Sequence, residues 1–330
     1  MGNPFPFLQM TTVSQRQMIR LFNFHEQICY ALISKKSAEF VKSLNLKVKA
    51  FSIEFLSPKR IEITIGDWGK NTTIRTNLID YWGTGHSIIQ FPMNNPPRWI
   101  YLNIGILEFL KLLSEIYHCK FLNYHFGNSK LWLPMEIIEK LSNGFQVDTL
   151  AITNKLKDIR RILKYHLPVN DLSILGNFAL TTREYEEIVY IWEYDYLLLA
   201  FFHLYDFSFL QFKTCHLEFL YIRENLPRIF NQFLKKWTQS ETYPKLKSMM
   251  IRWECPGFGA EIDTILEGVQ YKRLPNTQTL QFKCCYVSYY WYPIDTIHGK
   301  YGIRNHADNQ KAVLAIESSR GAFYWNFYVV

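Results

Sequence analysis

The sequence lacks the features that mark secreted, zinc-stabilised or membrane-spanning proteins. Its six cysteines include no CxxC pair and no even framework of short spacings, which disfavours a disulfide scaffold or a zinc module. The longest apolar run, 196–202, is far shorter than the roughly 20 residues that cross a bilayer. Residues 1–10 have no basic segment, and Pro4 and Pro6 interrupt their apolar stretch. We expect a cytoplasmic or nuclear protein with reduced cysteines and no membrane contact.

Signatures of catalysis are also missing. No GxSxG segment occurs, and the nine histidines are dispersed, without a paired aspartate around a serine. Gly66 and Gly69 are separated by two residues, whereas a phosphate-binding loop needs four. These absences favour a protein that is not an enzyme, with no catalytic residue and no cofactor.

One short segment imitates a metal site. His25 and Cys29 are four residues apart with Glu26 between them, as two zinc ligands on one helix face would be. Zinc needs a third protein ligand, so capping and packing of a short helix is the interpretation that we favour. Cys284 and Cys285 are adjacent and would point to opposite faces of a strand. We therefore expect no bound metal.

The charge is basic but scattered. The chain has 37 Lys and Arg against 29 Asp and Glu, a formal net charge of +8. A balance of this kind favours acidic partners only where the charge is clustered. The densest group lies opposite an apolar helical stripe and comprises Lys155, Lys157, Arg160, Arg161 and Lys164. We interpret it as a solvated helix face, and we do not expect nucleic acid as a partner.

A short apolar pattern, with further apolar residues at +3 and +5, recurs along the chain. The +3 and +5 positions share one face of an extended strand, and an amphipathic helix usually follows. Such a unit buries its apolar face only when copies stack, and stacked strand ends and loops suit protein recognition. The copies are Val147/Leu150/Ile152, Val169/Leu172/Ile174, Leu217/Leu220/Ile222, Leu246/Met249/Ile251 and Thr277/Leu280/Phe282.

Other periodicities predict what flanks these copies. Three short helices are expected over 14–22, 25–33 and 35–44, followed by a hairpin in which apolar residues of 51–55 and 61–65 alternate with polar ones. Segment 66–97 is rich in Gly, Asn and Pro, which predicts a linker loop. Later helices are expected after Asn103, at Pro134 to Leu141, after Asn154, and over 226–237 and 262–269. Strands are expected over 301–304, 313–316 and 323–329.

Several segments carry a resemblance to a known family. Near the N-terminus these are Phe-Pro-Phe-Leu at 5–8 and Ile-Cys-Tyr-Ala-Leu-Ile-Ser-Lys-Lys-Ser-Ala at 28–38. Towards the C-terminus they are Asn-Gln-Phe-Leu-Lys-Lys-Trp at 231–237, Tyr-Pro-Lys-Leu-Lys at 243–247 and Ile-Leu-Glu-Gly at 265–268. Tyr-Gly-Ile-Arg-Asn at 301–305 and Lys-Ala-Val at 311–313 complete the set. In this order they resemble the nematode F-box proteins that carry a C-terminal F-box-associated (type 2) domain.

The resemblance implies a mixed α/β (α+β) fold in three parts. An F-box-like segment of three helices would occupy 4–48, and a hairpin with a linker would occupy 49–98. An F-box-associated domain would occupy 99–330, built as a degenerate leucine-rich-repeat-like stack of strands and helices with a C-terminal cap of antiparallel strands.

The resemblance also implies a function. The chain would be the substrate adaptor of an SCF-type ubiquitin ligase, in which the F-box docks on the Skp adaptor, and through it on a cullin, while the C-terminal domain binds a protein substrate. The alternative is a repeat-type protein-interaction scaffold with a vestigial F-box and no ligase role. Apolar residues of the F-box-like segment would contact the Skp adaptor: Pro6, Leu8, Met18, Ile19, Phe24, Ile28, Leu32 and Ile33.

Overall fold

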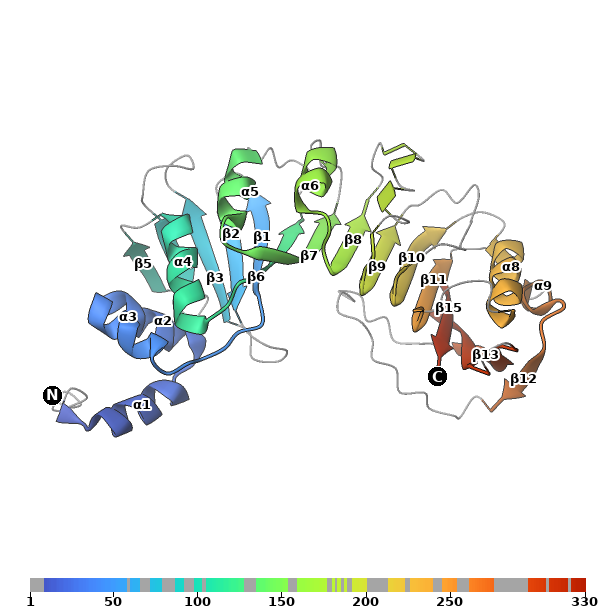
Figure 1. Ribbon diagram of the computed structural model, residues 1–330, viewed down its shortest axis with the longest axis horizontal. Helices are drawn as coiled ribbons and strands as arrows, with labels where there is room; N and C mark the ends of the chain where they lie inside the picture. Colours follow the sequence, from blue (N-terminus) through green and yellow to red (C-terminus); the bar gives the residue numbers. More distant parts are fainter. Residues whose placement is uncertain are drawn as a thin grey trace. The chain divides into compact units, whose positions relative to one another are not determined.

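The structure is a computed structural model of the 330-residue chain. Contacts divide it into two compact units, Met1–Leu150 and Ala151–Val330, and both combine helices with strands (Figure 1), which confirms the predicted mixed α/β class. The predicted domain limits at 48 and 98 stay predictions. The structure describes residues 9–57, 60–65, 72–78, 87–91, 98–102, 105–127, 135–153, 159–176, 180–181, 183–184, 187–188, 192–200, 213–222, 226–239, 245–253, 261–275, 296–306, 309–319 and 322–330.

Three short helices, hereafter the head, open the first unit. They are α1 (Thr12–Leu21), α2 (Phe24–Ile33) and α3 (Lys35–Lys42), as the sequence predicts. Each begins after a residue whose side-chain oxygen accepts a hydrogen bond from a first-turn N–H, namely Thr11, Asn23 and Ser34. Glu26 completes a capping box on Asn23. These caps satisfy backbone donors that short helices would otherwise leave open.

The sheet of the first unit is a meander with one parallel strand beside it. The predicted hairpin is confirmed, and its apolar positions on both strands are buried. β6 (Phe121–Phe126) pairs parallel with the first strand of the meander. Helices α4 (Ile106–Tyr117) and α5 (Met135–Ser142) confirm two further predictions. The meander strands, antiparallel in chain order, are β1 (Phe51–Ser57), β2 (Arg60–Ile65), β3 (Thr72–Leu78), β4 (Ser87–Phe91) and β5 (Arg98–Leu102).

Two local predictions for the first unit need correction or lie outside the described residues. Segment 66–97, predicted as a loop, contains β3 and β4. Apolar and polar residues alternate only weakly in β3, and Gly- and Pro-rich stretches flank it. The extended conformation of β3 therefore depends on its pairing with β2, in which Ile74 lies opposite Ile63. The residue before α4 is Gly105, whose N–H lies 3.3 Å from the Glu108 carboxylate, while the predicted cap Asn103 lies outside the described residues.

In the second unit three of the predicted copies fall on parallel strands. β8 (Asp171–Leu175), β9 (Tyr196–Ala200), β10 (His216–Ile222) and β11 (Ser248–Trp253) pair parallel in that order. β7 (Gln146–Thr153) crosses the boundary between the units and contains the first copy. The Thr277 copy lies outside the described residues. The paired rows across the four strands are Leu172, Leu197, Leu217 and Met249, and then Ile174, Leu199, Phe219 and Ile251. The +3 and +5 residues of the Val169 and Leu246 copies share these two rows, but β10, with the Leu217 copy, contributes Leu217 and Phe219 to them, and β9 contains no copy.

Antiparallel strands complete the second unit. β12 (Tyr271–Leu274), β13 (Thr296–Arg304), β14 (Lys311–Ser319) and β15 (Ala322–Val329) pair in chain order, and β15 also pairs antiparallel with β11. The three strands predicted at the end of the chain are confirmed. Helix α8 (Leu226–Thr238) packs on this part of the sheet (Figure 1), with Phe230 against Trp325 at 5.4 Å between ring centres and Trp237 against Phe327 at 5.1 Å.

The remaining helices of the second unit are short. α6 (Ile159–His166) buries Ile159, Ile162 and Leu163 and exposes Arg161 and Lys164, which confirms an amphipathic helix with a basic face from residue 159 onward. Lys155 and Lys157 of the predicted basic group lie outside the described residues. α9 (Glu261–Leu266) ends before a glycine at 268 with φ of 71°, shorter than the predicted 262–269. Within the described ranges, no helix combines the length and apolar character that crossing a membrane requires.

Asn231 joins α8 to α9, and its replacement should destabilise the second unit. Its buried Nδ2 donates to the carbonyl oxygens of Ile265 and Glu267, both at 2.8 Å. Asn231→Ala leaves both acceptors without this donor, so we expect a loss of about 1–3 kcal/mol in the free energy of unfolding, measured by urea denaturation. The control Arg228→Ala, at an exposed position of the same helix, should change it by no more than about 0.5 kcal/mol. Equal stability of the two variants would contradict this role.

Candidate partner-binding surface

Buried polar contacts anchor the head to the rest of the first unit. The Gln27 amide nitrogen donates to the carbonyls of Ile19 at 3.2 Å and Phe22 at 2.9 Å, which ties α1 to α2. The Tyr117 hydroxyl of α4 lies 3.3 Å from both the Gln27 amide oxygen and the Phe24 carbonyl. The Phe24 and Tyr117 rings meet edge to face at 5.4 Å. The head is therefore held on α4 and forms part of the first compact unit.

Two of the apolar residues predicted to contact a partner serve this internal packing. Ile19 and Ile28 are both 0% exposed, so a partner cannot reach either side chain in this conformation. Pro6 and Leu8 lie outside the described residues. The head thus uses part of the predicted set as its own core, which is expected where three short helices share one apolar layer.

The other predicted residues are accessible to different degrees. Met18, Phe24 and Leu32 are half-buried, and Phe24 is engaged by Tyr117 as described above. Ile33, at the end of α2, is 72% exposed. Met18, Leu32 and Ile33 therefore remain available for an apolar contact.

The structure adds two apolar residues that the sequence reasoning missed. Val13 is 66% exposed and Leu21 is 86% exposed, both on α1. Leu21 lies two residues after the buried Ile19, about 200° around the helix, so it points away from the core. The position of Leu21 opposite the buried side of α1 is the feature of the sequence from which its exposure could have been predicted. Val13, Leu21 and Ile33 are hereafter the exposed apolar residues of the head.

The segment that imitates a zinc site does not assemble a ligand set within the described residues. Cys29 Sγ lies 3.3 Å from His25 Nε2 on consecutive turns of α2. Among the described residues, no three His, Cys, Asp or Glu side chains are grouped as a metal site would require. Cys284 and Cys285 lie outside the described residues.

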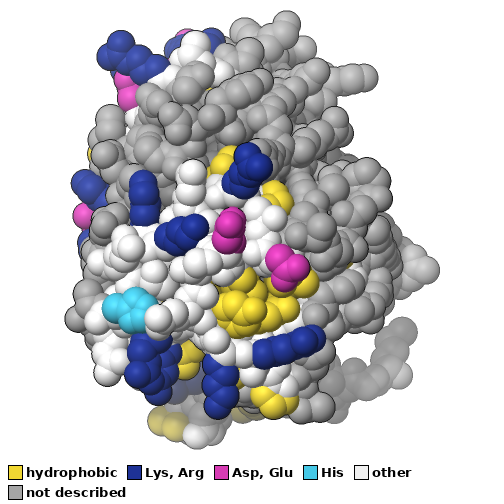
Figure 2. Space-filling view, turned by 90° about the vertical axis from the view of Figure 1, so that its right-hand side faces the viewer, with side chains coloured by type: hydrophobic (Ala, Val, Ile, Leu, Met, Phe, Trp, Pro, Cys, Tyr) yellow, Lys and Arg dark blue, Asp and Glu magenta, His cyan; other side chains and the backbone are white. Residues whose placement is uncertain are grey.

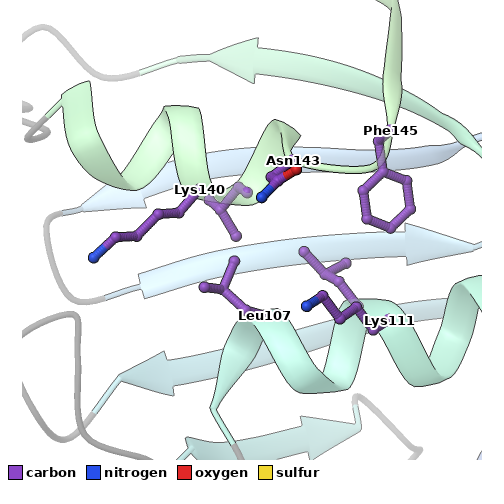
Figure 3. A pocket seen from close by; sticks show the side chains of 7 residues that line it. Leu107, Lys111, Lys140, Asn143 and Phe145 are labelled. Atoms are coloured by element: carbon purple, nitrogen blue, oxygen red, sulfur yellow. The ribbon is translucent and has the colours of Figure 1, made fainter.

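A small hollow lies between α4 and α5 (Figure 3). Its volume is about 80 Å³, below the roughly 300 Å³ at which pockets for drug-sized ligands begin. In Figure 3, Lys140 extends away from Asn143 and Phe145, so the polar groups do not converge on one point. This hollow does not support a small-molecule site. Its lining residues are Leu107, Leu110, Lys111, Lys140, Leu141, Asn143 and Phe145.

A buried acid lies on the sheet of the second unit. The Tyr196 hydroxyl of β9 donates to the Glu218 carboxylate of β10. Burial raises the pKa of Glu218 from its ordinary 4.5 to about 7, although the Tyr196 hydrogen bond lowers it. The carboxyl group therefore takes up a proton on folding at pH values between these two pKa values.

A serine and a histidine lie beside this pair on neighbouring strands. His216 Nδ1 is 2.8 Å from Ser248 Oγ, and burial together with Lys247 lowers the pKa of His216. A catalytic dyad also needs a third group that orients the imidazole through a hydrogen bond. The contacts of the described residues provide no such bond to the other ring nitrogen, so this pair does not support a nucleophilic site.

Comparison with known proteins gives no relative: no protein-family model, no curated protein and no solved structure matches the chain.

Glu218 should make the stability of the second unit depend on pH. Because folding raises the pKa of Glu218, its contribution to the free energy of unfolding is most favourable below pH 4.5 and is lost as the pH rises to about 7. Glu218→Gln removes this titration, so the variant should gain up to about 3 kcal/mol relative to the native chain between pH 4 and pH 8. Urea unfolding across this pH range measures the difference, and parallel profiles for the two proteins would contradict the assignment.

Proposed function

We propose that this protein is a non-enzymatic substrate adaptor of an SCF-type ubiquitin ligase, acting in the cytoplasm or nucleus. In this proposal the head docks on the Skp adaptor, and through it on a cullin. The second unit, as a degenerate leucine-rich-repeat-like stack, binds a protein substrate. The observation that carries the proposal is a capped three-helix head that leaves apolar side chains exposed, in a chain whose two ends resemble the F-box and the F-box-associated domain.

The geometry of the head supports a protein partner at this place. Covering a large aliphatic side chain contributes roughly 1.5–3 kcal/mol, so three exposed apolar residues within one small helical head provide a substantial part of a binding free energy. Val13, Leu21 and Ile33 lie on helices whose opposite faces are committed to the core. The half-buried Met18 and Leu32 would add to such a contact.

The second unit supports the substrate-binding part of the proposal. Its parallel strands β8 to β11 align their apolar residues in two rows, as the strands of stacked units do. Such a scaffold presents one side chain per strand at regular spacing, which suits recognition of an extended or flat protein surface. The polar residues Tyr196, His216, Glu218 and Ser248 occupy the face opposite the apolar rows, because alternate residues of a strand point to opposite faces.

A direct binding measurement with the Skp adaptor tests the proposal. The full chain should bind purified Skp adaptor in calorimetry, and Leu21→Asp/Ile33→Asp should weaken binding at least about tenfold, since two apolar contacts would be replaced by charges. Both positions are exposed, so the helical signal in circular dichroism should not change.

The matched control keeps the apolar residues. Gln17→Asp/Lys36→Asp places the same new side chains at exposed positions of α1 and α3 and should bind like the native chain. Deleting residues 1–48 is a poorer test, because it also removes the contacts of Gln27 and Phe24 with Tyr117 of α4. A native chain that does not bind the Skp adaptor would overturn the ligase role and favour the scaffold alternative.

A further inference from the structure

Three cationic side chains come together on the last strands of the second unit. Arg304 of β13 lies directly opposite Lys311 of β14, and Lys272 of β12 lies opposite Gly302 of β13. Residues two apart on a strand share a face, so Gly302 and Arg304 point the same way. Lys272, Arg304 and Lys311, hereafter the cationic patch, therefore share one face of three adjacent strands.

The cationic patch faces away from the apolar core. Phe327 packs on Trp237 of α8, and it pairs with Leu314, which pairs with Tyr301. These residues define the face of the sheet that α8 covers. Gly302 and Arg304 alternate with Tyr301 and Ile303, both buried, and so belong to the other face.

The three cations are exposed. Lys272, Arg304 and Lys311 are all exposed, and none of them makes an ion pair within the part of the chain that the structure describes. Like charges directly opposite each other on antiparallel strands are destabilising, by some tenths of a kcal/mol. The Arg304 and Lys311 pair carries this cost, and a bound anion would remove it.

The described surroundings of the patch carry charges of both signs. Glu317 of β14 is half-buried and accepts a hydrogen bond from Asn326 at 2.9 Å, and Asp263 of α9 interacts electrostatically with Tyr301 of β13. Figure 2, which looks at this end of the second unit, shows more dark blue Lys and Arg than magenta Asp and Glu among the coloured residues, with magenta side chains beside the central yellow group. An excess of cations on a surface attracts a negatively charged partner.

We propose that the cationic patch binds an extended, carboxylate-rich segment of a protein, and that this segment belongs to the substrate. The assignment of that segment to a substrate rests on the adaptor function proposed above. Carboxylates at alternate positions of an extended chain are about 7 Å apart. Diagonal cross-strand neighbours such as Lys272 and Arg304 are spaced by about 7–8 Å, so successive acidic side chains meet successive cations. Gly302 lies between them, with the Leu274 side chain packed over it.

Charge complementarity favours a short acidic peptide over nucleic acid as the occupant. Proteins that bind duplexes tightly neutralise about 6–10 phosphates, and three cations on one strand ladder give a much smaller footprint. The carboxylate spacing along an extended segment also matches the strand geometry, whereas a lone phosphate would use only the Arg304 and Lys311 pair.

Fluorescence anisotropy with the full chain tests the inference. The probe is a short fluorescein-labelled peptide in which Glu alternates with Ser, at low ionic strength. Arg304→Glu/Lys311→Glu should weaken its binding at least about tenfold, since attraction becomes repulsion. The control Arg161→Glu/Lys164→Glu changes the same residue types and the same formal charge at exposed positions of α6, and it should stay within about twofold of the native chain.

The other outcomes decide against the inference. Absence of peptide binding to the native chain, equal weakening in both double variants, or tighter binding of single-stranded DNA or of a phosphoserine peptide would each overturn it. Skp-adaptor binding, measured on the same proteins, also serves as a check of folding. If the native chain binds the Skp adaptor but not the peptide, the inference alone fails; if the native chain binds the peptide but not the Skp adaptor, the adaptor function alone fails.

Discussion

The register of the parallel strands in the second unit is the constraint on which its other features depend. Leu172, Leu197, Leu217 and Met249 align in one row across β8 to β11, and Phe327 of β15 continues the row. Because side chains alternate with a period of two, a slip of one residue in any strand would move its apolar residues to the wrong face. The aromatic contacts of α8 require this same register, since Phe327 is where Trp237 packs.

The same register determines which polar groups meet on the opposite face. Tyr196 and Glu218 form a buried pair because β9 and β10 align Tyr196 with His216, two residues before the acid. Arg304 likewise lies opposite Lys311 because of the register between β13 and β14. Thus one face of the sheet packs against α8, and the other holds the buried Tyr196 and Glu218 pair on β9 and β10 and the exposed cationic patch on β12 to β14.

The sequence predicted the elements with regular periodicity and missed those that depend on pairing. The three capped helices of the head, the hairpin, and α8 follow from local patterns. β9 was not recognised because Tyr196 to Ala200 is buried throughout, and a continuous apolar run does not reveal which residues face which side. For β3 and β4 the sequence predicts a loop, because their flanks are rich in Gly, Asn and Pro.

For the candidate binding residues, too, the sequence does not show which side chains are buried and which are exposed. Apolarity alone selected Ile19 and Ile28 together with Ile33, although the first two fill the core of the head and the third is exposed. Which side of a short helix packs inward depends on its neighbours, here Gln27 and Tyr117, and these contacts span about 90 residues of sequence. The cationic patch could not be predicted at all, because Lys272, Arg304 and Lys311 are brought together only by strand register.

In the proposed role, the chain links a substrate to a ligase through its head. The most direct test is assembly: the full chain, the Skp adaptor and a cullin, each purified, are mixed and separated by size-exclusion chromatography with light scattering. The account predicts a single complex containing all three proteins in equal amounts. Elution of the chain alone, with the Skp adaptor and cullin together in a separate peak, would contradict it.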